Sequence, residues 1–141
     1  KAHDMVLATG HISTKESMVL VEEARNMGIG RVVVTHGTTM SFWTGMTLED
    51  MKTLASMGAY IEHCLHVMMP LTYRLAPREL VEIIMAIGTE NCIVSTDFGQ
   101  DYHPMPAEGF RMGIATLLQA GMEEVEVGML VKDNPSRLMG L

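Results

Sequence analysis

The sequence predicts an α/β fold built from four strand–helix units, and two repeated features support this prediction. First, four short runs are apolar almost throughout, which is typical of parallel strands covered on both faces. These runs are Met5–Thr9, Arg31–Thr35, Ala59–Glu62 and Cys92–Thr96. Second, glycines that are 30, 30 and 33 residues apart close four helix-like stretches, at Gly28, Gly58, Gly88 and Gly121. A glycine supplies the left-handed cap past a helix end, and this spacing fits one strand plus one returning helix.

The helices between the strands have recognisable start residues. Ser13–Glu16 has the pattern of a capping box, Thr47 is a capping residue followed by acids, and Pro77 suits the first helical position. The rest of the chain is assigned to two further helices, Pro106–Ala120 and Pro135–Leu141, and to two pocket-forming loops, Thr38–Met46 and Asp101–Pro106.

Length and composition favour one domain over residues 1–141 and exclude several classes of protein. The chain has 141 residues and a net charge of −7, and its ten basic residues form no cluster, which argues against nucleic acid as a partner. No apolar run is long enough to cross a bilayer, so no membrane association is expected. Cys64 and Cys92 lack the C-x-x-C spacing and are predicted to be buried free thiols. With no visible signal peptide, a cytoplasmic location is the simplest expectation.

Four strand–helix units can be completed in two ways. They can form half of an eight-stranded (β/α)8 TIM barrel, or an open flavodoxin-like parallel sheet. A whole barrel needs about 250 residues, so this chain could supply only half of one. The chain begins at Lys1, a few residues before the first predicted strand, which suggests a portion of a longer protein.

Ionisable side chains stand at or near the ends of all four predicted strands, where both architectures place their ligands. They are His11, His36, Glu62 and Asp97. Asp97 is the strongest candidate, because packing explains poorly a carboxylate that directly follows an apolar strand. Each of the other three has an alternative role, as a helix cap, a hydrogen-bonded loop imidazole or a solvated carboxylate. Three further imidazoles, at His63, His66 and His103, are predicted to lie mainly in loops.

Two imidazoles and a carboxylate form a ligand set that suits Zn²⁺, Mn²⁺ or Fe²⁺. Such an ion lowers the pKa of bound water and polarises a carbonyl or phosphoryl oxygen, so hydrolysis is the reaction class that the pattern favours. Asp97 could bind the metal and also take a proton from the water. His11 and His36 would be metal ligands or donors to the developing oxyanion.

The order of the residues at these strand ends, two histidines followed by two carboxylates, resembles that in the C-terminal half of the amidohydrolase superfamily of metal-dependent TIM-barrel hydrolases. The similarity covers nearly the whole chain and is closest to a poorly characterised branch of that superfamily. Its motifs are ATGHIS (Ala8–Ser13), VVVTHG (Val32–Gly37), GAYIEHC (Gly58–Cys64), STDFGQ (Ser95–Gln100) and NPSRLMGL (Asn134–Leu141).

The resemblance implies a role for each matching residue. His11 would be the metal-site histidine after the fifth barrel strand, and His36 the one after the sixth. Asp97 would be the metal ligand and proton shuttle after the eighth. Glu62 follows the seventh strand, where the superfamily has no constant ligand, so its role stays open.

Two features of the superfamily have no counterpart in the chain, and one of them is the lysine or acid often found after the fourth strand. The superfamily has a His-x-His pair after its first strand, but His3 has no histidine two residues later. The missing strands would then come from an N-terminal half-barrel or from a second copy, so a homo-oligomer is one expectation, and the substrate would be a small molecule. Two alternatives remain: a flavodoxin-like module that binds phosphate at the Gly10–Ser13 turn, and a catalytically silent association domain.

Overall fold

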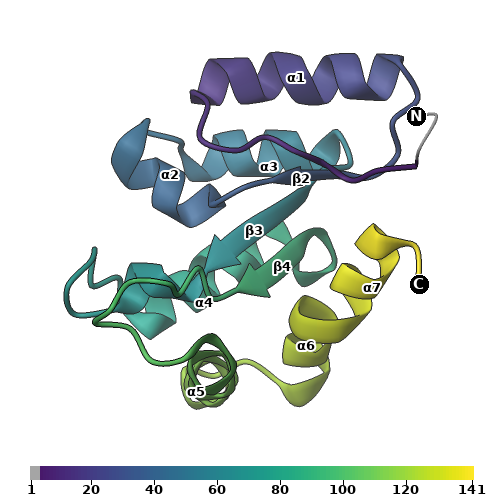
Figure 1. Cartoon of the computed structure of the whole chain (residues 1–141). Coiled ribbons are helices and arrows are strands. Elements are labelled where there is room, and N and C mark those ends of the chain that lie inside the picture. The colour runs from purple at the N-terminus through teal and green to yellow at the C-terminus, as the bar shows by residue number, and fades with distance from the viewer. Residues whose placement is uncertain (1–3) are drawn as a thin grey trace.

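Four parallel strands form the centre of the molecule in a computed structural model that describes residues 4–141, and His3 therefore lies outside the described residues (Figure 1). The strands are hydrogen-bonded in the order β1-β2-β3-β4, which is also their order along the chain. The elements are β1 (Leu7–Ala8), α1 (Thr14–Asn26), β2 (Val32–Val34), α2 (Gly37–Trp43), α3 (Leu48–Ser56), β3 (Tyr60–Cys64), the 3₁₀ helix η1 (Leu65–Met68), α4 (Pro77–Ile87), the 3₁₀ turn η2 (Thr89–Asn91), β4 (Cys92–Ser95), α5 (Pro106–Gln119), α6 (Glu124–Gly128), the π-helical turn η3 (Met129–Asp133) and α7 (Asn134–Met139). The predicted α/β class with a parallel sheet is confirmed.

The predicted helix boundaries agree closely with the structure. Ser13 caps α1 through a reciprocal capping box with Glu16, and Thr47 caps α3 in the same way with Asp50. Pro77 begins α4. The four periodic glycines all have positive φ, between 73° and 111°, which a residue with a side chain adopts only at a cost. Local capping chemistry therefore sets the ends of these helices.

The predicted loop Thr38–Met46 is wrong over most of its length, because residues Gly37–Trp43 form helix α2. Its first four residues are buried, and a Cβ on Gly37 would lie only 2.4 Å from Cγ2 of Ile61 on β3. Close packing against β3 therefore holds this helix, although its glycine and threonines have weak helical propensity. The segment 97–105 contains no helix or strand, as predicted for the loop Asp101–Pro106, and α5 begins at Pro106.

The two faces of the sheet differ in what covers them. Val34, Ile61 and Val94 point into the main core, which the helices complete. On the opposite face, Val33 and Ile93 pack only with Leu138 of α7 and a few partly buried neighbours. Four of the helices contact one another in sequence, α1 with α3, α3 with α4, and α4 with α5. They follow in that order from the top to the bottom of Figure 1, while α7 lies near the starts of the strands.

Both outer strands of the sheet lack a second partner within the described part of the chain. β1 pairs only with β2, and β4 pairs only with β3 among residues 4–141. Unpaired N–H and C=O groups at a sheet edge favour pairing with another strand. None of the described helices is long and apolar enough to span a bilayer.

His63 was predicted to lie in a loop, but it is part of β3 and is completely buried. Its Nδ1 contacts the hydroxyl of Thr38, whereas its Nε2 has no hydrogen-bond partner among the described residues. Burial lowers the pKa of His63 to about 3 from its usual 6.5, because the charged ring would lose its hydration. The folded chain therefore holds this imidazole neutral.

We expect the burial of His63 to make the metal-free protein less stable in mild acid. Below pH 6.5 the unfolded chain protonates His63 and the folded chain does not, so stability falls as the pH drops toward about 3. Between pH 7 and pH 5 the loss should be about 2 kcal/mol. Urea unfolding of wild type and of His63→Gln, in the presence of a chelator, measures the difference. Equal pH dependence in the two proteins would contradict a buried neutral His63.

Candidate functional site

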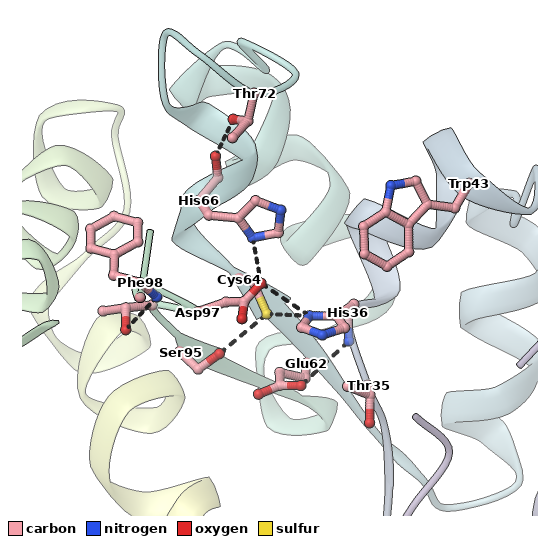
Figure 2. A network of polar contacts seen from close by, with 12 residues as sticks. Thr35, His36, Trp43, Glu62, Cys64, His66, Thr72, Ser95, Asp97 and Phe98 are labelled. Atoms are coloured by element: carbon pink, nitrogen blue, oxygen red, sulfur yellow. Dashed lines mark hydrogen bonds and ion pairs between the residues drawn. The ribbon is translucent and has the colours of Figure 1, made fainter. Parts of the chain in front are cut away.

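A cluster of ionisable side chains lies at the carboxyl ends of β2, β3 and β4 (Figure 2). Its members come from four segments of the chain. His36 follows β2, Glu62 and Cys64 belong to β3, His66 belongs to η1, and Asp97 follows β4. In a parallel sheet the carboxyl ends of all strands lie on the same side of the sheet, so residues far apart in sequence converge there.

His36 and Asp97 share an unusual backbone conformation. Their φ values are 58° and 52°, in the left-handed region that non-glycine residues adopt infrequently. Such conformations cost about 1–3 kcal/mol and cluster at functional sites. At both positions the left-handed residue lies two residues past the end of a strand, β2 for His36 and β4 for Asp97.

Packing of α2 on β3 positions His36. The backbone N–H of His36 donates a hydrogen bond to Oε2 of Glu62 at 3.3 Å, and its ring Nδ1 lies 2.8 Å from Sγ of Cys64. His36 is 8% exposed, so its ring is largely shielded from water. Glu62 therefore lies at the site, although β3 continues two residues beyond the strand end predicted there.

Cys64 lies at the centre of the cluster. Besides His36, its Sγ contacts Oγ of Ser95 at 3.3 Å. Burial raises the pKa of the Cys64 thiol strongly, and the negative charges of Glu62 and Asp97 add to the effect, while the contact with Ser95 opposes it. The thiol is therefore protonated near neutral pH when no cation is nearby, which disfavours a role as a free nucleophile.

His66 was predicted to lie in a loop, but it is buried in η1 with 5% exposure. Its Nδ1 is 3.1 Å from Oδ2 of Asp97, an ion-pair distance, yet the geometry is not that of a hydrogen bond and Nδ1 has no such bond within residues 4–141. Burial lowers the pKa of His66, and the carboxylate of Asp97 opposes this in part. His66 is thus a functional candidate that the sequence analysis missed.

Asp97 joins the two imidazoles of the cluster. Its Oδ2 is also 3.9 Å from Nδ1 of His36, and its side chain is 38% exposed. The carboxylate can therefore contact both the buried ring nitrogens and solvent, as a ligand that also transfers a proton must.

Two groups of donor atoms could hold a metal ion, with all atoms of each group within 4.8 Å of one another. One comprises His36, Glu62 and Cys64, and the other comprises Cys64, His66 and Asp97. Three of the four sequence-predicted residues, His36, Glu62 and Asp97, are therefore brought together. His11 belongs to neither group.

His11 lies at the rim of the cluster. Its exposed ring stacks on that of His36 at a centroid distance of 4.8 Å and also contacts Trp43. The N–H groups of the Gly10–Ser13 turn, where the alternative prediction places a phosphate, are partly occupied. Gly10 donates to the hydroxyl of Thr35, and Ser13 donates to Glu16.

An aromatic pocket opens beside the cluster. Its volume is about 350 Å³, comparable with small ligand sites, and Trp43 donates its ring N–H to the hydroxyl of Tyr73 on one side of it. It is lined by Trp43, His66, Leu71, Thr72, Tyr73, Gln100 and Tyr102. His66 therefore belongs both to the donor cluster and to the pocket wall. His103 is half-buried, with its ring against Phe98 at 4.5 Å.

Comparison with known protein families finds a match to the first part of the chain. The model of a family of unknown function, DUF6282, matches residues 1–62, which include His11, His36 and Glu62. The match ends before Cys64, His66 and Asp97. No curated protein matches the chain. No solved structure matches it either.

Proposed function

We propose that the chain is a half-barrel of the amidohydrolase type and acts as a metal-dependent hydrolase. A divalent transition metal, with Zn²⁺ favoured over Mn²⁺ and Fe²⁺, would activate a water molecule against a C–N, C–O or P–O bond of a small molecule. The observation that carries the proposal is the pair of overlapping donor groups at the carboxyl ends of the strands.

The strand order supports a half-barrel over an open flavodoxin-like sheet. A flavodoxin-like sheet has the order 2-1-3-4-5, in which the second strand lies outside the first. Here the order follows the chain, β1-β2-β3-β4. Right-handed crossovers in such an order place successive helices on the same face, as in a barrel wall. The main core on one face and the small Val33–Ile93 cluster on the other agree with this.

The chemistry of the donors supports hydrolysis. His36 and Asp97 combine an imidazole with a carboxylate that is partly open to solvent. A metal ion held there would supply a water with a lowered pKa. Asp97 could accept the proton of that water and pass it to the leaving group, and the neighbouring pocket of about 350 Å³ offers space for a small substrate. Within residues 4–141 the outer edges of β1 and β4 have no partner strand, and a second copy or an N-terminal half-barrel would add strands there.

Metal analysis of the purified protein tests the proposal. After loading with Zn²⁺ and gel filtration, we expect about one ion per chain. His36→Asn and Asp97→Asn should each lower this occupancy severalfold, and both substitutions keep a residue that tolerates the left-handed backbone. Asp101→Asn, at an exposed loop position, is the matched control.

Two outcomes would contradict the proposal. One is occupancy near zero in the wild type, and the other is occupancy that neither site variant changes. Binding of inorganic phosphate by the metal-free protein would instead favour the flavodoxin-like binding module.

A further inference from the structure

Two residues of the donor groups, Cys64 and His66, have no counterpart in the resemblance and no part in the proton transfer described above. We propose that both are ligands of the metal, which makes the centre a mixed site of thiolate, imidazole and carboxylate. Such a site selects Zn²⁺ or Co²⁺ over Mg²⁺ and Mn²⁺. This inference rests on the proposed function, since it concerns the same ion.

The positions of the donor atoms support this assignment. Cys64 is the member common to both donor groups. With Zn–S of about 2.3 Å and Zn–N or Zn–O of about 2.1 Å, neighbouring ligand atoms of a tetrahedral site lie about 3.3–3.7 Å apart. Nδ1 of His66 lies 3.1 Å from Oδ2 of Asp97, and that oxygen lies 3.9 Å from Nδ1 of His36. Sγ of Cys64, 2.8 Å from Nδ1 of His36, would move outward by less than an ångström.

His66 supplies an independent observation that points to a ligand. Its side chain is more than nine-tenths buried, and Nδ1 faces Asp97 and the thiol but has no hydrogen bond within the described residues. A buried polar atom without a hydrogen bond costs about 1–3 kcal/mol, and Nδ1 of His66 differs from Nε2 of His63 because it faces two further donor residues, Cys64 and Asp97. A metal ion at this position would accept the lone pair of Nδ1.

The backbone of His66 is held in place independently of any ion. Its N–H donates to the carbonyl of Thr96 at 3.1 Å, next to Asp97. Its carbonyl accepts the hydroxyl of Thr72 and the N–H of Met69. The bond to Thr96 ties η1 to the end of the β4 segment, so the ring of His66 and the carboxylate of Asp97 lie side by side (Figure 2). A site with pre-positioned ligands loses less entropy when it binds an ion.

The identity of the donors then determines which metal is preferred. Thiolate is a soft ligand that favours Zn²⁺ and related ions, whereas Mg²⁺ and Mn²⁺ favour oxygen ligands. A bound cation would also change the protonation state of Cys64, because a coordinating thiol loses its proton outright. The chain contains its own control, since Cys92 is equally buried but points into the helix-covered core.

Cobalt spectroscopy of the full chain tests the assignment. Co²⁺ bound by a thiolate gives a sulfur-to-cobalt charge-transfer band in the near ultraviolet, and we expect it in the wild type. Cys64→Ser should lose the band, and Cys92→Ser should keep it. Competition with a chromogenic chelator should show at least tenfold weaker Zn²⁺ binding in Cys64→Ser and in His66→Gln. His103→Gln should stay within threefold of the wild type, and circular dichroism should confirm that each variant is folded.

The outcomes separate this inference from the proposed function. A wild type that binds Co²⁺ stoichiometrically without the near-ultraviolet band would overturn the thiolate assignment and leave the hydrolase proposal intact. A wild type that binds neither Co²⁺ nor Zn²⁺ would overturn both. If His66→Gln is folded and binds Zn²⁺ as tightly as His103→Gln does, His66 is not a ligand.

Discussion

An Asp97→Asn variant loaded with Zn²⁺ is expected to hydrolyse small esters or phosphoesters about 10²–10⁴-fold more slowly than the wild type. The asparagine keeps one oxygen that can face the metal, but it cannot accept a proton from the attacking water. Because the φ of residue 97 is 52°, and asparagine tolerates this conformation well, the fold should be unchanged. The loss would therefore report on proton transfer and metal binding rather than on stability.

Initial rates with 4-nitrophenyl acetate and 4-nitrophenyl phosphate, corrected for free Zn²⁺, provide the measurement. Asp101→Asn serves as the control, because Asp101 is exposed in the following loop. Ester cleavage by the thiol itself is measured without metal, by comparing wild type and Cys64→Ser in the presence of a chelator. A rate for Asp97→Asn within threefold of the wild-type rate would remove Asp97 from the reaction.

Asn134→Asp is expected to lower the free energy of unfolding by about 3–5 kcal/mol at neutral pH. The side chain of Asn134 is completely buried, and its Nδ2 donates to the carbonyls of Thr89 at 2.7 Å and Cys92 at 2.8 Å. An ionised aspartate would direct an oxygen at both carbonyls and leave them unsatisfied. Arg137, whose Nη1 lies 3.3 Å from Oδ1, would compensate only in part.

Urea unfolding at several pH values measures this loss. The deficit should shrink as the pH falls toward the ordinary aspartate pKa of about 3.9, since a protonated carboxyl can donate again. Asn26→Asp, at an exposed position in the last turn of α1, should cost no more than about 1 kcal/mol. Equal stability of Asn134→Asp and wild type would show that these hydrogen bonds do not anchor the C-terminal segment to β4.

Prediction from the sequence was most accurate for features that depend only on residues close to one another in the chain. The capping boxes at Ser13 and Thr47 and the helix start at Pro77 were predicted correctly, because each requires only atoms within one helical turn. Helix α2 could not be predicted in this way. Its residues have weak helical propensity, and it forms because Gly37 allows the chain to pack on Ile61, which is 24 residues away.

The same limit applies to the candidate site. His36 and Asp97 could be identified because each directly follows a predicted apolar strand, Arg31–Thr35 or Cys92–Thr96. His66 could not, because β3 runs two residues further than predicted and η1 then folds its ring back toward Asp97. Cys64 was predicted to be a buried thiol, which is correct, but nothing local indicated that its sulfur would lie beside His36.

The sequence alone determined the α/β class, the order of the strand–helix units and the residue types at the strand ends, because periodicity and capping are properties of short segments. Only the tertiary structure decided which of those side chains meet. Parallel pairing aligns the ends of β2, β3 and β4, and so brings Cys64 and His66 to Asp97 while His11 stays at the rim. The physical reason is that strand register and helix packing depend on contacts between residues 24 or more positions apart, which no local pattern specifies.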